Sequence, residues 1–181
     1  MSSVVRPIMH EVIDRATLIL CYIYTINSHM ISSKRNKTYK APYKGVFRPT
    51  NPKKYVGDSR KIIYRSSWEK KFMKHCDTNP EIIEWASEEM FVHYVSPIDK
   101  KIHRYFPDFL VKTSNGKKIM IEIKPAIQCK PPRPRSRKTK RYVKEQFAFI
   151  KNISKWKAAK EYCSNNGIEF KIFTEKELNI N

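Results

Sequence analysis

Four stretches rich in apolar residues predict β-strands in the second half of the chain. They are residues 89–95 (EMFVHYV), 102–111 (IHRYFPDFLV), 118–124 (KIMIEIK) and 168–174 (IEFKIFT). The segments SPIDKK and TSNGKK separate the first three, and the second carries the Asn-Gly dipeptide of a tight hairpin. Pro107 has no N–H to donate, so it predicts an edge or bulged position within its strand.

Two helices frame these strands. Ser66 and Glu69 have the spacing of a capping box, so a helix should begin there and stop before Pro80. A second helix should begin at Thr139 and end near Gly167. Their apolar stripes are Trp68, Phe72 and Cys76 in the first helix and Val143, Phe147, Ile150, Ile153 and Trp156 in the second. The order of helix, β-meander, long helix and strand predicts a mixed sheet flanked by helices, in the α/β or α+β class.

Composition narrows the choice of partner. The 181 residues suffice for one domain of ordinary size, and 40% hydrophobic residues are too many for a disordered chain. Lys and Arg number 37 against 17 Asp and Glu, a formal net charge of +20. Such an excess favours nucleic acid first and an anionic membrane surface second, with a soluble basic protein lacking a specific partner as the alternative. Four scattered cysteines without a CxxC pair argue against structural zinc and suit a reducing cytosol.

The positive charge is clustered in two segments. Residues 34–61 hold ten Lys or Arg and one acidic residue. We interpret them as an extended basic arm that lies on phosphates and packs its aromatic rings on the domain or on bases, the alternative being a poorly ordered leader. Residues 129–144 hold eight basic residues and no acidic one, and their proline-rich first half predicts an exposed loop. The apolar run 16–26 is too short to span a bilayer, which takes roughly 20 residues, and predicts an accessory helix or strand.

Two carboxylates and a lysine, those of Asp108, Glu122 and Lys124, lie within residues 104–125, a stretch that otherwise has the pattern of a buried β-hairpin. Side chains alternate along a strand, so Glu122 and Lys124 share one face. Ile119, Ile121 and Ile123 share the other face and can bury against a helix. Asp108 lies on the partner strand, and the thirteen residues between it and Glu122 suffice for a strand end, the turn and the return. Pairing of the two strands therefore brings Asp108 beside Glu122 and Lys124.

Two carboxylates held a few ångströms apart repel each other and favour a cation between them. Oxygen ligands select a hard ion such as Mg²⁺ or Mn²⁺, and the backbone carbonyl of Ile123 could complete the protein ligands. Water bound to such an ion has a lowered pKa and can attack phosphorus, with Lys124 orienting or deprotonating it. The alternative is that Glu122 and Lys124 belong to an ordinary solvated strand face.

The Pro107–Asp108 pair and the Glu-x-Lys thirteen residues later resemble the motif of the PD-(D/E)XK nucleases. The resemblance extends through YKGVFRPTNPKKYVGDSRKIIYRSSWEKKFMKHCD, EWASEEMFVHYVSPIDKKIHRYFPDF and KTKRY. Over roughly residues 40–175 the sequence is similar to the head completion nucleases of T-even-type tailed bacteriophages. It is more distantly similar to transposon-encoded endonuclease subunits with an SxWE…H.RY.PDF…EIK layout. Residues 1–38 match neither group.

The resemblance implies a restriction-endonuclease-like core with a central mixed sheet of about four or five strands and helices on both sides. It implies Asp108 and Glu122 as metal ligands, Lys124 as the catalytic lysine, and Glu69 facing the same site, which competes with the capping-box role of Glu69. We divide the chain into an N-terminal extension (1–38), a basic arm (39–64) and the nuclease domain (65–181). We expect DNA contacts from Arg104, which has the strand parity of Asp108, and from Arg133, Arg135, Arg137, Lys138, Lys140 and Arg141.

The expected function is that of a Mg²⁺- or Mn²⁺-dependent deoxyribonuclease acting on double-stranded DNA. The resemblance implies an endonuclease, leaves exonuclease activity open, and places it in phage head completion, where packaged DNA is cleaved or trimmed so that heads can join tails. Head, portal or neck proteins would be its partners, and the virion head and host cytoplasm its location, with no membrane and no nucleotide cofactor. The main alternative is a structural virion protein that binds DNA ends without cleaving, and a third is a transposition endonuclease with a partner recombinase.

Overall fold

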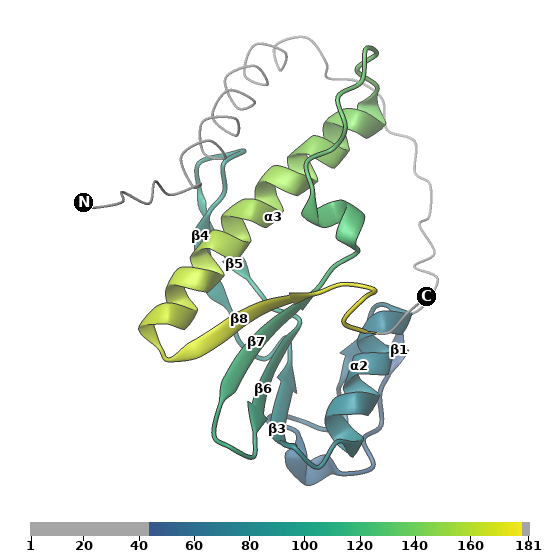
Figure 1. The fold of residues 1–181 in the computed structure, drawn as a ribbon, viewed down its shortest axis with the longest axis vertical. Helices are drawn as coiled ribbons and strands as arrows, with labels where there is room; N and C mark the ends of the chain where they lie inside the picture. Colours follow the sequence, from purple (N-terminus) through teal and green to yellow (C-terminus); the bar gives the residue numbers. More distant parts are fainter. Residues whose placement is uncertain (1–43, 179–181) are drawn as a thin grey trace, which may run out of the picture. The chain divides into compact units, whose positions relative to one another are not determined.

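The computed structural model describes residues 44–178 (Figure 1). The predictions for the extension at 1–38, the apolar run 16–26 and the beginning of the basic arm lie outside the described residues. In chain order the elements are β1 (Gly45–Val46), the 3-10 helix η1 (Pro52–Lys54), β2 (Ile63–Tyr64), α2 (Ser67–Thr78), β3 (Ile82–Ser87), β4 (Val92–Val95), β5 (Ile102–Tyr105), β6 (Phe109–Thr113), β7 (Lys118–Ile123), the 3-10 helix η2 (Ala126–Cys129), α3 (Lys140–Asn165) and β8 (Ile168–Phe173).

A mixed four-stranded sheet with the order β3-β6-β7-β8 forms the centre of this fold. Strands β3, β6 and β7 are antiparallel, and β7 pairs with β8 in parallel. The parallel pair requires a crossover, and α3 provides it between β7 and β8. The predicted fold class, a mixed sheet flanked by helices, is confirmed.

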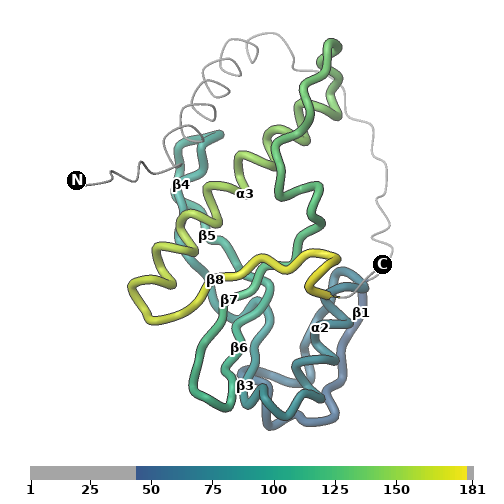
Figure 2. Tube along the Cα trace, in the orientation of Figure 1, coloured from purple at the N-terminus to yellow at the C-terminus, as the bar shows by residue number. Residues whose placement is uncertain are grey.

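The two helices cover opposite faces of the sheet (Figures 1 and 2). On the α2 face, Phe72, Met73 and Cys76 pack with alternate residues of the strands, as predicted for the isoleucines of β7. On the α3 face, Met120 and Leu110 are packed in one cluster with residues of the long helix. Strand residues of that α2 cluster are Trp85, Phe109, Val111, Ile119, Ile121 and Ile123, and the helix residues of the α3 cluster are Ile153, Trp156, Ala159 and Cys163.

Both helices begin and end close to the predicted positions. Ser66 caps α2, with its Oγ accepting a hydrogen bond from the Glu69 N–H at 3.1 Å, and the helix ends at Thr78. Thr139 caps α3 in the same way. Gly167 follows the end of α3 with φ +65°, a left-handed conformation that glycine adopts without a Cβ clash.

The prediction of a single strand over residues 102–111 is wrong in one respect. The structure has two strands there, β5 and β6, and they belong to different sheets. The chain breaks at Phe106 and Pro107, so β5 pairs with β4 in a separate ribbon while β6 joins the central sheet. Pro107 is fully buried between them and cannot donate to either ladder, which explains the break. The trace in Figure 2 shows the ribbon running beside α3, which contacts β4.

Strand β3 was not predicted. Its pairing with β6 shifts between Ile82 and Glu84, so buried and exposed positions do not alternate regularly along it. The period of two that identifies a strand is therefore absent from the sequence here.

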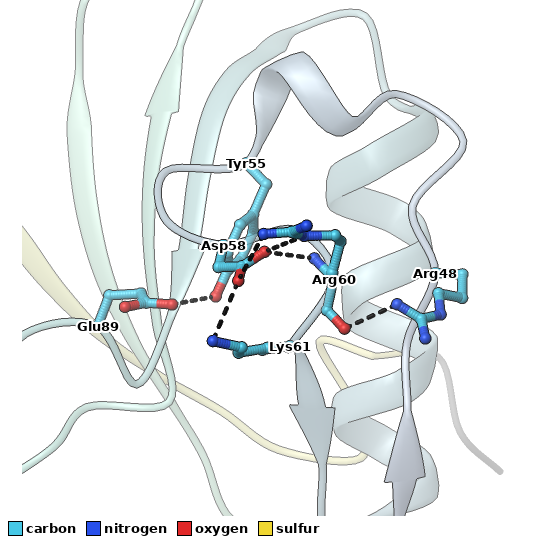
Figure 3. Close-up of polar contacts among 6 residues, drawn as sticks. All are labelled: Arg48, Tyr55, Asp58, Arg60, Lys61 and Glu89. Atoms are coloured by element: carbon cyan, nitrogen blue, oxygen red, sulfur yellow. Dashed lines mark hydrogen bonds and ion pairs between the residues drawn. The ribbon is translucent and has the colours of Figure 1, made fainter.

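The described part of the basic segment packs on the domain. Phe47, Tyr55 and Ile62 are buried, and the rings of Phe47 and Tyr55 meet Trp85 edge to face at 5.9 and 4.7 Å. Figure 3 shows how polar contacts fix this segment: Tyr55 Oη donates to Glu89 Oε1 at 2.7 Å, and Arg48 Nη1 to the Arg60 carbonyl at 2.7 Å. Packing on the domain is one of the two arrangements expected for these aromatic rings. Within residues 44–178 no helix has the length and apolarity needed to cross a membrane.

Candidate active site

Asp108 occupies the junction between the ribbon and the central sheet. It directly precedes β6, and its Oδ2 accepts a hydrogen bond from the Ile123 N–H at 2.6 Å. Because Phe109 pairs with Ile121, Asp108 comes opposite Glu122 in the continued register. The predicted meeting of these two acids at one end of the β6–β7 pair is thus what the structure has.

Glu122 is buried on the α3 side of β7, with 4% of the residue exposed. Its Oε2 accepts a hydrogen bond from the Tyr105 hydroxyl at 2.7 Å, and its Oε1 lies 3.0 Å from the Lys124 Nζ. Tyr105 comes from the last position of β5 and is itself buried. The carboxylate is therefore held in one orientation from two sides, by a neutral donor and by a cation.

The electrostatics of the site reflect two acids with one adjoining lysine. Burial and the nearby Glu122 carboxylate raise the pKa of Asp108 well above its ordinary value. Burial alone would lower the pKa of Lys124, but Glu122 and Asp108 reverse this, and the pKa is raised. Burial, followed by the Glu122 charge, also raises the pKa of the Tyr105 hydroxyl, which keeps it a hydrogen-bond donor. A cation bound between the two acids would offset their mutual repulsion and favour their ionised forms.

Glu69 lies near this site but serves the start of α2. Its Oε1 accepts from the Ser66 hydroxyl at 2.8 Å, and its Oε2 accepts from the Arg65 N–H at 2.7 Å. Its charge nevertheless contributes to the raised pKa of Asp108. The position of Glu69 therefore allows both the capping role and a role at the site, and its hydrogen bonds are those of the helix cap.

Two residues near the site were missed by the sequence analysis, Tyr105 and Lys155. The Lys155 Nζ, from the middle of α3, lies 5.4 Å from the Tyr105 ring centroid and 5.9 Å from that of Tyr94. Burial lowers the pKa of Lys155, and the charges of Glu122, Lys124 and Asp108 all act on it. Only the break before Asp108 turns Tyr105 towards Glu122, and no sequence spacing relates Lys155 to the motif.

The basic residues predicted to contact DNA are exposed. The segment that carries most of them leaves Lys124 through η2 and reaches the beginning of α3 (Figure 1). Arg135 and Arg141 share Glu145 as an ion-pair partner, at 3.4 and 2.9 Å. Arg104 lies apart from these, on β5 in the ribbon. The exposed residues are Arg104, Arg133, Arg135, Arg137, Lys138, Lys140 and Arg141.

The donor set suits a hard divalent cation. Among residues 44–178 no three His, Cys, Asp or Glu side chains gather closely enough to hold a metal ion. Asp108 and Glu122 supply carboxylate oxygens, and a backbone carbonyl and water would have to supply the rest. The raised pKa of Asp108, caused by burial and by Glu122, is relieved when a cation shares the two carboxylates. The two acids therefore fit Mg²⁺ or Mn²⁺ as ligands.

Comparison with known proteins supports the resemblance inferred from the motif. The family described as the TnsA-like endonuclease N terminal matches residues 79–175, more than half of the chain. The head completion nuclease of Enterobacteria phage T4 is 43% identical over 140 residues, which cover 75% of this chain and 93% of that protein. The family match spans β3 to β8 and includes Asp108, Glu122 and Lys124. The predicted resemblance to these nucleases is confirmed.

Proposed function

Because this chain belongs to the TnsA-like endonuclease family, we propose that it is a divalent-metal-dependent DNA nuclease whose active centre is formed by Asp108, Glu122 and Lys124. The observation that carries this proposal is the meeting of two carboxylates with one lysine at the end of the β6–β7 pair. A strand buried by helices on both faces has no structural need for a glutamate, and burying its charge is costly. We therefore attribute these buried charges to the proposed cleavage reaction.

Asp108, Glu122 and the carbonyl of Ile123 are the residues that would hold Mg²⁺ or Mn²⁺. When bound, such an ion supplies Lewis-acid chemistry: it lowers the pKa of water and offsets phosphate charge. Tyr105 donates to Glu122 and keeps that carboxylate aimed at the site. Lys124 stands 3.0 Å from Glu122, where its ammonium can orient the attacking water and stabilise the negative charge that develops on the phosphate oxygens.

Binding of the substrate is assigned to the positive surface. The exposed arginines and lysines of residues 130–141 follow Lys124 in the chain, on the segment that leads from η2 to α3, and we assign duplex binding to them. Their contacts with phosphates would be independent of sequence. We keep the division into an extension (1–38), a basic segment (39–64) and a catalytic domain (65–181) as a proposal, in which the described part of the basic segment packs on the catalytic domain.

The likeness to a phage head completion nuclease supports a biological role for this cleavage. We place the protein in the virion head and host cytoplasm, where it cuts or trims packaged double-stranded DNA before tails join. Head, portal or neck proteins are its proposed partners. Endonuclease action is the primary activity, and exonuclease trimming is proposed as its extension at DNA ends.

The test is the incubation of purified protein with supercoiled plasmid in Mg²⁺, Mn²⁺, Ca²⁺ or chelator. We expect nicking and then linearisation in Mg²⁺ and Mn²⁺, and none with chelator. Ca²⁺ should support binding with little cutting, since its looser coordination positions water less well. Folded protein that binds DNA but leaves plasmid intact in every metal would instead favour a structural DNA-end-binding protein.

A further inference from the structure

The ribbon of β4 and β5 has two unlike faces. On one face Val92, Tyr94 and Tyr105 are buried with Trp156 of α3. On the other face, His93 pairs with Arg104 and Val95 with Ile102. Phe91 and Phe106 continue this outer face just beyond the paired residues, with ring centroids 5.8 Å apart. The outer face is thus built from Phe91, His93, Val95, Ile102, Arg104 and Phe106.

This outer face is both apolar and exposed. Val95 and Ile102 are 59% and 72% exposed, and Phe91 and Phe106 are each 42% exposed. The Arg104 guanidinium carbon lies 5.4 Å from the Phe91 ring centroid and 5.8 Å from that of Phe106. We call Phe91, Arg104 and Phe106 the aromatic platform. Large exposed apolar residues grouped in this way mark an interaction surface.

A short and well-fixed connection joins the aromatic platform to the candidate active site. Phe106 stands two residues before Asp108, and the intervening Pro107 is fully buried. Tyr105, the neighbour of Phe106, points to the opposite side and donates to Glu122. The aromatic platform is therefore close to Asp108 along the chain, on the face of the ribbon opposite to the one from which Tyr105 reaches Glu122.

We propose that the aromatic platform stacks an unpaired nucleobase of the bound DNA, so that the protein prefers DNA with unpaired bases, as at forks and frayed ends. This inference rests on the proposed DNA nuclease function and adds a substrate class to it. Contact with phosphates needs only cations and leaves exposed phenylalanines without a role. Bases within an intact duplex already stack on one another, whereas an unpaired base has a free face for an aromatic ring or a guanidinium.

Charge favours DNA over a protein as the occupant of the aromatic platform. The chain carries a formal net charge of +20, and Arg104 places a cation on the two rings themselves. An apolar protein partner would be served by the exposed valine and isoleucine without a guanidinium at the centre. A polyanion that also carries planar rings matches both the charge and the chemistry of this surface.

The test compares a fork, which is a duplex ending in two unpaired arms, with a fully paired duplex of equal length. A 2-aminopurine at the first unpaired position reports stacking through its quenched fluorescence, and a chelator prevents cleavage. We expect wild-type protein to bind the fork about tenfold more tightly and to quench the probe. The Phe106→Leu variant should lose the preference for the fork and the quenching of 2-aminopurine, whereas Phe106→Tyr should keep both. Arg104→Lys retains the charge and should lose most of the preference.

Val46→Ala serves as the matched control, since Val46 is 53% exposed on β1 and should change nothing. Thermal unfolding checks that each variant is folded. If a Phe106 variant is unfolded, the fork preference of Arg104→Lys tests the inference instead. Equal binding of fork and duplex by an active wild-type enzyme overturns the inference and leaves the proposed function standing. Wild-type behaviour of Phe106→Leu also overturns it and assigns the surface to protein docking. A wild-type protein that neither binds nor cuts DNA contradicts the proposed function itself.

Discussion

Two buried carboxylates in this protein have opposite surroundings. Asp77, at the end of α2, is 2% exposed, and Glu122 is 4% exposed. The oxygens of Asp77 accept hydrogen bonds from the N–H groups of Thr50 at 2.7 Å and Asn51 at 2.9 Å. Lys54 Nζ donates to the backbone carbonyl of Asp77, at 2.9 Å, and to that of Asn79, at 2.8 Å. Asp77 thus ties the basic segment to α2 and is fully satisfied by the protein.

Glu122 differs because it faces a second acid. Tyr105 and Lys124 are partners of Glu122, but Asp108 stands opposite it. Burial and the Glu122 charge raise the pKa of Asp108. Lys124 adjoins two facing carboxylates here, whereas the single carboxylate of Asp77 accepts hydrogen bonds from two N–H groups. A buried acid that the protein satisfies is a structural device. Two facing acids beside one lysine are the arrangement that our proposal of a cation-binding site requires.

The largest expected difference between the two regions is in the rate of DNA cleavage, and substitutions of Lys124 and Lys54 test it. Lys124→Ala should lower the cleavage rate by about 10²–10³-fold, because its charge acts on the transition state. Lys54→Ala should leave the rate of folded protein unchanged and lower the free energy of unfolding by about 1–2 kcal/mol. Single-turnover cleavage and urea denaturation of both variants measure the two effects. A slow Lys54→Ala enzyme beside a fast Lys124→Ala enzyme would invert the comparison.

The second prediction concerns stability, where the substitution at Asp77 should have a larger effect than the substitution at Asp108. Asp77→Ala leaves two N–H groups without their acceptor, so the free energy of unfolding should fall by about 2–4 kcal/mol. Asp108→Ala removes a carboxylate that burial and Glu122 disfavour but also the acceptor of the Ile123 N–H, so the free energy of unfolding without metal should fall less than in Asp77→Ala. Denaturant titrations of both proteins in chelator decide this. Equal destabilisation by the two substitutions would mean that Asp108 is also a structural residue.

The basic loop should contribute affinity rather than chemistry. If it meets phosphates, replacing Arg135, Arg137 and Lys138 by Ala should reduce the slope of log affinity against log salt by about 0.9 per lost contact. Turnover at saturating DNA should change little. The control replaces three other exposed lysines, Lys74, Lys157 and Lys160, and should leave the slope nearer to that of wild type. An unchanged slope in the loop variant would exclude this loop from the interface.

The smallest expected effect is in the pH dependence of stability. The pKa of Asp108 is raised in the folded state above its unfolded value of about 3.9, so folding favours its neutral form. Its contribution to stability is therefore full below pH ~4 and is lost as the pH rises through the folded pKa. Urea titrations from pH 4 upward in chelator should show this decline in wild type relative to Asp108→Asn. Parallel pH profiles for the two proteins would show that Asp108 ionises without penalty.

Sequence was sufficient for those features that local patterns determine. Ser66 and Thr139 cap their helices where their spacing predicted, and Ile119, Ile121 and Ile123 face α2 as their alternation predicted. The pairing of Asp108 with Glu122 followed from the length of the hairpin alone. Each of these depends on residues close together in the chain.

Other features depend on contacts that local sequence does not encode. Strand β3 was missed because its register shift removes the alternation. The break at Pro107 could not be located, since a proline permits an edge, a bulge or a break. Tyr105 and Lys155 therefore entered the site only through tertiary structure, one through that break and the other through the packing of α3.

The most direct measurement of the central claim compares wild-type protein with Asp108→Asn on supercoiled plasmid in Mg²⁺, with DNA binding measured in parallel in Ca²⁺. The substitution keeps the shape of the side chain and removes one negative charge from the proposed metal site. We predict equal or slightly tighter DNA binding, since a charge that repels phosphate is gone, and cleavage slower by orders of magnitude. Equal cleavage by the two proteins would contradict the assignment of this pair of acids as the active centre.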